Sequence, residues 1–163
     1  MLPVMGHVRL QRFSLAQLPG LMSWFPDKEA CTVWGGPGFR FPFTAETFRN
    51  DAKLDSLSTW ALMDDAGALA GFGQYYLRVG RCHLGRLAIA PGLRGRGLGT
   101  TLVHELCRVG SAALAVDSCS LFVLPGNERA MRLYQRLGFS AAQYPEPSPM
   151  FEDCIYMVAS RLA

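Results

Sequence analysis

Lysine, closely spaced cysteines and long apolar runs are scarce or missing in this sequence. Only Lys28 and Lys53 are lysines among 16 basic residues, and the net charge of +3 gives no general case for nucleic-acid binding. The five cysteines lack C-x-x-C spacing and are odd in number, so we expect no zinc site. We expect buried, reduced thiols instead. No apolar run approaches the roughly 18 residues of a membrane-spanning helix, and the segment from Met1 to His7 lacks a cationic leader. We therefore expect a cytoplasmic protein with no metal and no membrane or nucleic-acid partner.

Carboxylates are also missing from the middle of the chain, because no Asp or Glu occurs between Asp65 and Glu105. Half of the 163 residues are hydrophobic and 18% are charged, which excludes a disordered chain. No repeat or linker divides the sequence, so we expect a single domain over residues 1–163. Fourteen of the basic residues are arginines, and five of them fall in two segments that are described next: Arg94, Arg96, Arg129, Arg132 and Arg136.

The first of these segments has the order strand, glycine-rich turn, helix. An apolar run over Leu84–Ala90 stops at Pro91–Gly92, and glycines then alternate at Gly95, Gly97 and Gly99. A helical stripe follows directly, formed by Leu98, Leu102, Leu106, Val109 and Ala113. Backbone N–H groups and the dipole at a helix start attract anions, and glycine lets a ligand approach the backbone. Together with the flanking arginines, this pattern predicts a phosphate or pyrophosphate site.

Two common phosphate-binding motifs do not fit this segment. A Walker loop needs Gly-Lys-Ser/Thr at its end, and neither lysine is near. A dinucleotide fingerprint needs a glycine where this chain has Thr100, and an acidic residue at the end of the next strand. Asp117 has roughly the right spacing but precedes the apolar run Leu121–Leu124 instead of following it.

The pattern Arg94-x-x-Gly97-x-Gly99 after a strand instead resembles the acetyl-CoA pyrophosphate motif of the GNAT N-acetyltransferases. A later segment, from Val123 to Phe139, supports the resemblance: it has Asn127, then Ala130, Tyr134 and a closing Gly138-Phe139 at the spacing of the family's second motif. The resemblance extends over about Ala70 to Met157.

The resemblance implies a mixed α/β fold with a mostly antiparallel central sheet of six or seven strands and about four flanking helices. The strands Cys82–Ala90 and Ser118–Leu124 are then expected to be parallel neighbours that splay apart to admit the cofactor. The implied function is transfer of the acetyl group of acetyl-CoA to a primary amine of a small molecule or a protein, directly within a ternary complex. The alternative is a non-catalytic acyl-CoA sensor. Assembly as a homodimer is left open.

The resemblance also implies which residues hold acetyl-CoA. Backbone groups of the central strand would bind the pantetheine arm and polarise the thioester carbonyl, the glycine loop would bind the pyrophosphate, and an asparagine would contact the arm. The expected cofactor-binding residues are Leu87, Ala88, Ile89, Arg94, Gly95, Arg96, Gly97, Leu98, Gly99, Thr100 and Asn127. The first three would equally form a plain core strand, and Asn127 is also an ordinary helix N-cap.

Two residues are the catalytic candidates. Tyr134 falls at the family's general-acid position, and a phenol can donate a proton to a leaving thiolate. It would otherwise fill a half-buried helix face. The strand position at which some relatives carry a glutamate falls on His83, which could accept a proton directly or through water. A half-buried strand histidine and a water relay without a dedicated base remain open.

An aromatic segment from Cys31 to Thr44 is a third candidate region. Three glycines and two prolines in this segment argue against a regular element, and four aromatic residues are too many for a solvated loop. We expect either a loop over the core or, through Trp34, Phe39 and Phe41, an aromatic wall beside the acceptor pocket. Elsewhere, Ser14, Thr44 and Asn127 are the expected helix caps, and residues 64–67 the expected hairpin turn.

Overall fold

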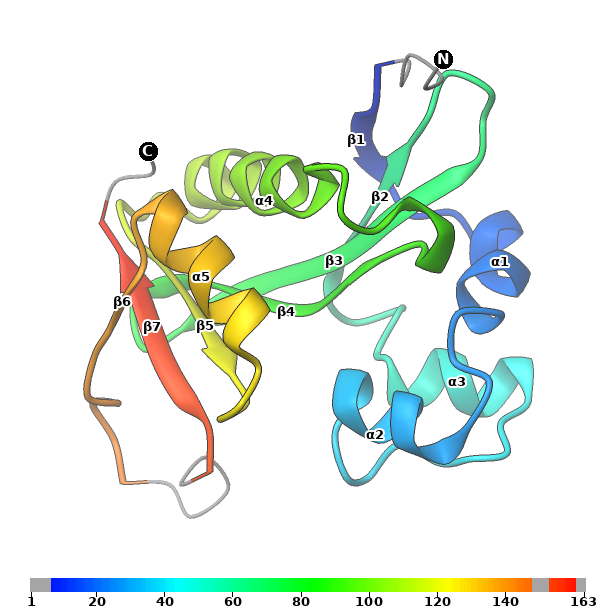
Figure 1. Ribbon diagram of the computed structural model, residues 1–163, viewed down its shortest axis with the longest axis horizontal. Helices are drawn as coiled ribbons and strands as arrows, with labels where there is room; N and C mark the ends of the chain where they lie inside the picture. Colours follow the sequence, from blue (N-terminus) through cyan, green and yellow to red (C-terminus); the bar gives the residue numbers. More distant parts are fainter. Residues whose placement is uncertain (1–6, 148–152, 161–163) are drawn as a thin grey trace. The chain divides into compact units, whose positions relative to one another are not determined.

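The computed structural model describes residues 7–147 and 153–160, so most of the segment that lacks a leader lies outside the description. The chain divides into two compact units, one of Met1–Gln74 with Arg86–Leu102 and one of Tyr75–Gly85 with Val103–Ala163. Within the described residues, seven strands form one mixed sheet in the order β1-β2-β3-β4-β5-β7-β6 (Figure 1). Five α-helices and two 3-10 turns accompany it. The predicted fold class is confirmed, with one helix more than expected.

The first unit contains an N-terminal strand and a local hairpin, whose second strand continues into the second unit. β1 (Arg9–Arg12) pairs antiparallel with β2 (Ser58–Met63). The turn to β3 (Leu69–Arg78) is closed by Asp64, whose Oδ1 accepts the N–H groups of Ala66 at 2.9 Å and Ala68 at 2.8 Å. The expected hairpin turn is therefore held by an aspartate that bonds its own backbone, as short polar side chains do in turns.

Three short helices of the first unit begin at side-chain caps. Ser14 caps the 3-10 turn Leu15–Gln17 that leads into α1 (Leu18–Met22). Asp27 caps α2 (Lys28–Gly35), and Thr44 caps α3 (Ala45–Asp51) in a capping box. The expectation that the whole segment Cys31–Thr44 lacks a regular element is wrong, because α2 continues up to its glycines and ends at Gly36, where φ is 99°.

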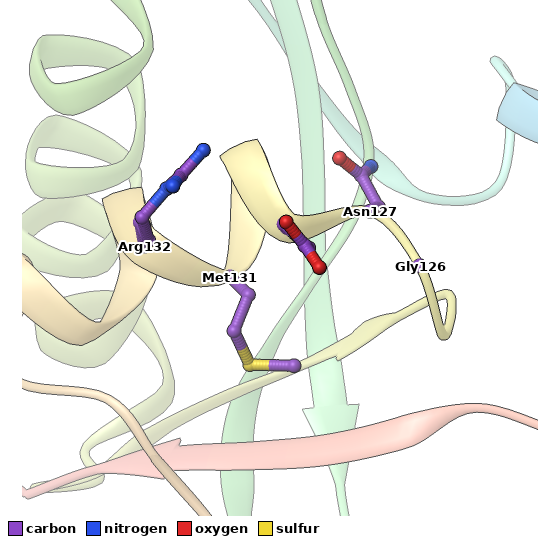
Figure 2. A pocket seen from close by; sticks show the side chains of 5 residues that line it. Gly126, Asn127, Met131 and Arg132 are labelled. Carbon is purple, nitrogen blue, oxygen red and sulfur yellow. The ribbon is translucent and has the colours of Figure 1, made fainter.

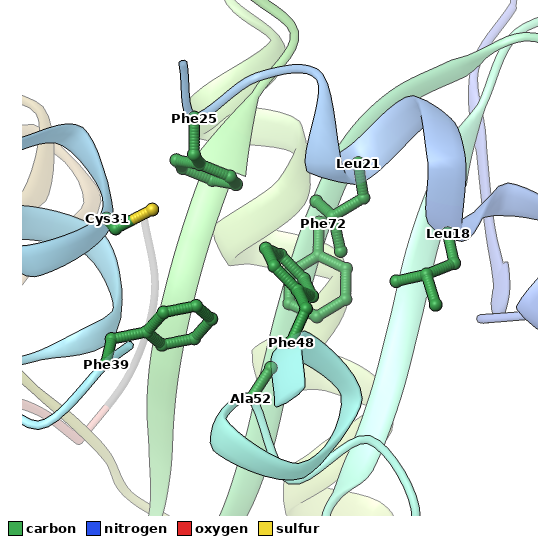
Figure 3. Packing of buried hydrophobic residues seen from close by; sticks show 8 residues of the cluster. All are labelled: Leu18, Leu21, Phe25, Cys31, Phe39, Phe48, Ala52 and Phe72. Carbon is green, nitrogen blue, oxygen red and sulfur yellow. The ribbon is translucent and has the colours of Figure 1, made fainter. Parts of the chain in front are cut away.

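An aromatic core joins these helices to β3. Figure 3 shows α1, α3 and the neighbouring segments directing their apolar side chains toward one another. The buried members are Leu18, Leu21, Phe25, Cys31, Phe39, Phe48, Ala52 and Phe72. Trp34 of α2 is half-buried against them, with its ring centroid 4.2 Å from that of Phe25 and 5.6 Å from that of Phe48. Aromatic rings at these spacings contribute about 0.5–1.5 kcal/mol per pair beyond area burial.

The second unit contains the parallel crossover. β4 (Arg81–Ile89) and α4 (Leu98–Leu114) each run across the boundary between the units, and β5 (Cys119–Val123) follows. β5 pairs parallel with β4, Cys82 opposite Cys119 and His83 opposite Ser120, which confirms the predicted pairing. On its other side β5 pairs antiparallel with β7 (Ile155–Ala159), which also pairs with β6 (Ser140–Ala141).

Close packing of α4 on these strands requires a glycine. A Cβ at Gly110 would lie 2.6 Å from the Sγ of Cys82 and 2.9 Å from the ring of Tyr75, too close for any side chain. α5 (Glu128–Leu137) follows β5 and ends at Gly138, which is left-handed with φ 107°. Within residues 7–147 and 153–160, none of the helices combines the length and apolarity needed to cross a membrane.

Candidate functional site

The glycine loop of the first unit has the backbone of an anion cradle. After the 3-10 turn Pro91–Leu93, Arg94 is extended, and Gly95 and Gly97 have φ of 79° and 82°. Alternation of left-handed and ordinary residues turns successive N–H groups toward one side, which forms a concavity that suits anions. A Cβ built at Gly97 would meet no atom within 4 Å. The loop therefore presents bare backbone beside open space.

The start of α4 adds donors to this loop. Thr101 makes the first bonds of the helix, its N–H and Oγ1 lying 3.3 Å and 3.4 Å from the carbonyl oxygen of Gly97. The first N–H groups of any helix have no partner inside it and point out of its end. Leu98 is buried and anchors the helix, whereas Gly95, Arg96 and Thr100 are exposed. This arrangement fits a phosphate group.

The loop is fastened back to the strand that precedes it. Arg94 donates from Nε to the carbonyl oxygen of Ile89 at 3.4 Å, and Ala90 donates its N–H to Ala70 of β3 at 2.9 Å. Leu87, Ala88 and Ile89 are half-buried. The predicted strand and loop residues are therefore contiguous in one unit.

In the second unit, a pocket opens at the start of α5. It has a volume of about 230 Å³ and is lined by Gly126, Asn127, Glu128, Met131 and Arg132 (Figure 2). The Asn127 side chain caps the helix by accepting the N–H of Ala130 at 3.3 Å. Of these five residues, only Asn127 was predicted from the sequence to bind the cofactor. Arg132 was noted as one of the five arginines of the two motif segments, without a role.

Tyr134 lies on α5 about two turns after Asn127. Its ring meets that of Phe139 edge to face, with centroids 6.0 Å apart. Burial raises the pKa of the Tyr134 phenol to about 12. The hydroxyl therefore keeps its proton at neutral pH, as a general acid must.

His83 is enclosed within the sheet of the second unit. It is 2% exposed, and its Nδ1 lies 2.8 Å from the Oγ of Ser120. The ring sits 5.3 Å from that of Tyr76 and 4.7 Å from that of Phe122, centroid to centroid. Burial, and secondarily the positive charge of Arg78, lower the pKa of His83 to about 3. The imidazole is neutral at physiological pH and only weakly basic.

The three aromatic candidates differ in exposure. Phe39 is 4% exposed and belongs to the core, whereas Trp34 and Phe41 are half-buried. Phe41 packs edge to face on Phe43, with centroids 5.6 Å apart. The indole Nε1 of Trp34 is already used, because it donates to the carbonyl oxygen of Arg86 at 2.9 Å. Arg86 had no role in the sequence prediction.

The structure thus groups the candidates by unit. The first unit holds the strand, the loop and the aromatic residues, and the second holds His83, Asn127 and Tyr134. In the described part of the chain, no group of three or more His, Cys, Asp or Glu side chains could hold a metal ion.

Known proteins share this architecture. A structure of AAC(6')-Ib in complex with ribostamycin and coenzyme A superposes with a TM-score of 0.74 at 24% identity, covering 94% of this chain and 93% of that one. The spermidine N-acetyltransferase of Vibrio cholerae superposes with a TM-score of 0.71 at 18% identity, covering 95% of each chain, so the fold is one that N-acetyltransferases have. The profile of the acetyltransferase (GNAT) family matches residues 24–139, and the chain belongs to that family.

Curated relatives match over shorter stretches. The glucosamine 6-phosphate N-acetyltransferase of Trypanosoma brucei brucei is 31% identical over 40% of this chain and 44% of its own length. The putative ribosomal protein bS18 alanine N-acetyltransferase of Bacillus subtilis (strain 168) is 28% identical over 61% of this chain and 66% of its own. The matches thus span less than two thirds of each relative.

Proposed function

We propose that the chain is an acetyl-CoA-dependent N-acetyltransferase that acts on a primary amine of a small molecule or a protein by direct transfer in a ternary complex. The observation that carries the proposal is the loop from Arg94 to Leu98, where two left-handed glycines and the start of α4 leave N–H groups around an open space. Family membership supports the pyrophosphate of acetyl-CoA as the ligand proposed for that loop.

Apart from Asn127, the remaining proposed cofactor contacts belong to the same unit. Gly95, Gly97, Gly99 and Thr100 would supply backbone N–H groups, and Arg94 and Arg96 would supply charge, of which Arg94 also fixes the loop to Ile89. Backbone groups of Leu87–Ile89 would hold the pantetheine arm, and one of their N–H groups would polarise the thioester carbonyl, the activated group that acetyl-CoA supplies. Asn127 would contact the arm through the part of its side-chain amide that does not accept the capping bond from Ala130.

Two proton transfers complete the chemistry. Tyr134 is protonated at neutral pH, as any phenol near or above its ordinary pKa is, and would donate a proton to the departing thiolate. The acceptor ammonium must lose a proton, and a neutral His83 can accept one directly or through water. Its lowered pKa makes it a weak acceptor, so we favour a water relay and retain His83 as the alternative.

The acceptor would lie beside the aromatic residues of the first unit. Trp34 and Phe41 are half-buried and could form a wall for an organic amine, with Phe39 supporting them from the core. The relatives named above act on an amino sugar phosphate and on a protein alanine, so both small-molecule and protein acceptors are candidates. We further propose a cytoplasmic protein that works as one domain, with homodimer formation to be tested.

A second candidate function is an acyl-CoA sensor without turnover. The low pKa of His83 and the lack of any carboxylate between Asp65 and Glu105 favour it, since neither offers a strong base. The deciding experiment is thiol release from acetyl-CoA over a panel of amines, polyamines, amino acids and peptides.

Tyr134→Phe is the informative variant in that assay. It keeps the ring against Phe139 and removes the proton, so we expect kcat to fall by about 10²- to 10⁴-fold, the usual cost of losing a general acid. CoA affinity by calorimetry is expected to stay unchanged. CoA binding without thiol release from any acceptor would instead establish the sensor, and an absence of CoA binding would refute both functions.

A further inference from the structure

β4 contains a backbone irregularity at Arg86. Its φ is 47°, the left-handed region that side chains other than glycine disfavour. Two points align β3 with β4: the turn at Val79–Gly80, and the bond from the N–H of Ala90 to the carbonyl oxygen of Ala70. Between these two points, β4 has one residue more than β3. One extra residue opposite a shorter strand is a β-bulge, which re-aims the residues that follow it. Strain of this kind persists only where the surroundings hold it.

The Arg86 side chain is held by a buried polar network. Its Nη1 donates to Gln74 Oε1 at 3.1 Å and its Nη2 to the carbonyl oxygen of Asp51 at 3.3 Å. Gln74 is fully buried, and its Nε2 donates to the carbonyl oxygen of Ala52 at 2.8 Å and to Thr59 Oγ1 at 3.0 Å. The guanidinium is therefore tied to β3 and to the end of α3, and through Gln74 to β2.

The Arg86 main chain is held by Trp34. The indole Nε1 donates to the carbonyl oxygen of Arg86 at 2.9 Å, a bond that spans 52 positions of sequence. The indole cannot easily turn away, because it stacks on both Phe25 and Phe48, with centroid distances of 4.2 Å and 5.6 Å. A carbonyl that an ordinary strand would pair with its neighbour is thus bound by a side chain of α2.

We propose that Trp34 and Arg86 are positioning residues: they hold the bulge in β4 and thereby orient the backbone N–H groups of Leu87–Ile89. The catalytic consequence rests on the proposed function, which assigns to those groups the polarisation of the thioester carbonyl. Trp34 then has two separable roles, its ring in the acceptor wall and its N–H in the geometry of the strand.

Trp34→Phe tests the proposal, because it keeps an aromatic ring and removes the N–H. Trp60→Phe is the matched control, since it removes an indole N–H that donates to Ser58 Oγ at 2.8 Å, within β2 and away from β4. We expect amide hydrogen exchange at residues 87–89 to accelerate about tenfold in Trp34→Phe, in keeping with the loss of one buried hydrogen bond, and to stay unchanged in the control.

Kinetics provide the second readout. If the N–H groups are misaligned, kcat falls by about tenfold, again in keeping with the loss of one hydrogen bond. The calorimetric affinity for CoA falls by less, because the glycine loop, which Trp34→Phe leaves unchanged, would still hold the pyrophosphate. Equal exchange rates in Trp34→Phe and Trp60→Phe would overturn the proposal, and so would an unchanged kcat. Should the wild type release no thiol with any acceptor, the proposed function fails, whereas faster exchange in Trp34→Phe still supports the positioning of the strand.

Arg86 gives an independent test if Trp34→Phe does not fold. Arg86→Gly accepts the positive φ but loses the guanidinium, whereas Arg86→Ala loses the guanidinium and retains the strain. We expect both to lower kcat, with Arg86→Gly melting at the higher temperature. Arg86→Ala melting at or above Arg86→Gly would show that the left-handed bulge is not required, and would overturn the proposal.

Discussion

His83 loses its charge on folding, because burial among Tyr76, Phe122 and Ser120 disfavours the imidazolium. Its pKa is about 3 in the folded chain, against 6.5 for the unperturbed group. Between these values the unfolded chain binds more protons, so the stabilisation is fully present above pH 6.5 and is lost as the pH falls toward 3.

The expected result is a free energy of unfolding that falls as the pH decreases from 6.5 to 4, by at most about 1.4 kcal/mol per pH unit for this group. Urea unfolding at several pH values measures it. His83→Gln cannot titrate and should show a shallower dependence, since both proteins have the same carboxylates and differ only at this group. Parallel curves for the two proteins would contradict the neutral, buried state of His83.

Arg86 and Gln74 are residues whose roles the sequence could not reveal. The bond between Trp34 and Arg86 joins positions 52 apart, and Arg86 meets Asp51 over 35 positions, so no local spacing points to either contact. A single glutamine in the apolar run Leu69–Tyr76 was the available signal, because a buried amide requires partners.

At the scale of elements, a pair of matched glycines allows the effect of backbone strain to be measured separately from the blocking of a ligand. Gly97 and Gly67 have nearly the same φ, 82° and 81°, and a Cβ on either meets no atom within 4 Å. Gly67 lies in the hairpin turn before β3, whereas Gly97 lies in the proposed pyrophosphate site. A valine at either position carries a similar backbone cost, and only one of them faces the proposed ligand.

We therefore expect Gly97→Val and Gly67→Val to lower the melting temperature by similar amounts, and only Gly97→Val to weaken CoA binding, by tenfold or more. The affinity estimate assumes that about 1.4 kcal/mol is lost when one backbone contact is blocked. Calorimetry with CoA measures the affinity. Arg94→Ala should weaken binding less, because the N–H groups remain. Equal CoA affinities in the two valine variants would place the pyrophosphate elsewhere.

The elements that sequence predicted well are those with local signals. Thr44 and Asn127 cap α3 and α5 as expected, and Gly138 ends α5, because caps are set by residues a few positions apart. α2 was missed because the glycines and prolines of Cys31–Thr44 dominated the prediction, although they lie at the end of this helix and after it. Asp27, whose Oδ1 accepts the N–H of Ala30 at 2.8 Å, was the signal for its start.

At the scale of the whole molecule, the fold was predicted from the resemblance of the two motif segments to a family, which implied the order of strand, loop, helix and parallel strand. The resemblance then placed the candidate site residues on that order. What it could not supply is the long-range polar network around Arg86 or the enclosure of His83, since both depend on which side chains meet after folding.

The five cysteines report on the integrity of the whole fold. Cys31, Cys82, Cys107 and Cys119 are buried, and Cys154 is half-buried. Native packing should therefore protect four thiols together, while only the fifth meets solvent.

With a colorimetric disulfide reagent at pH 8, we expect one thiol to react quickly in the native protein and the other four only at the rate at which the chain opens. All five should react at once in concentrated guanidinium chloride. Cys154→Ser is the control and should abolish the fast phase. If that variant still shows a fast thiol, one of the other four cysteines is not buried as the structure places it, and the packing of the unit that holds it is looser than described.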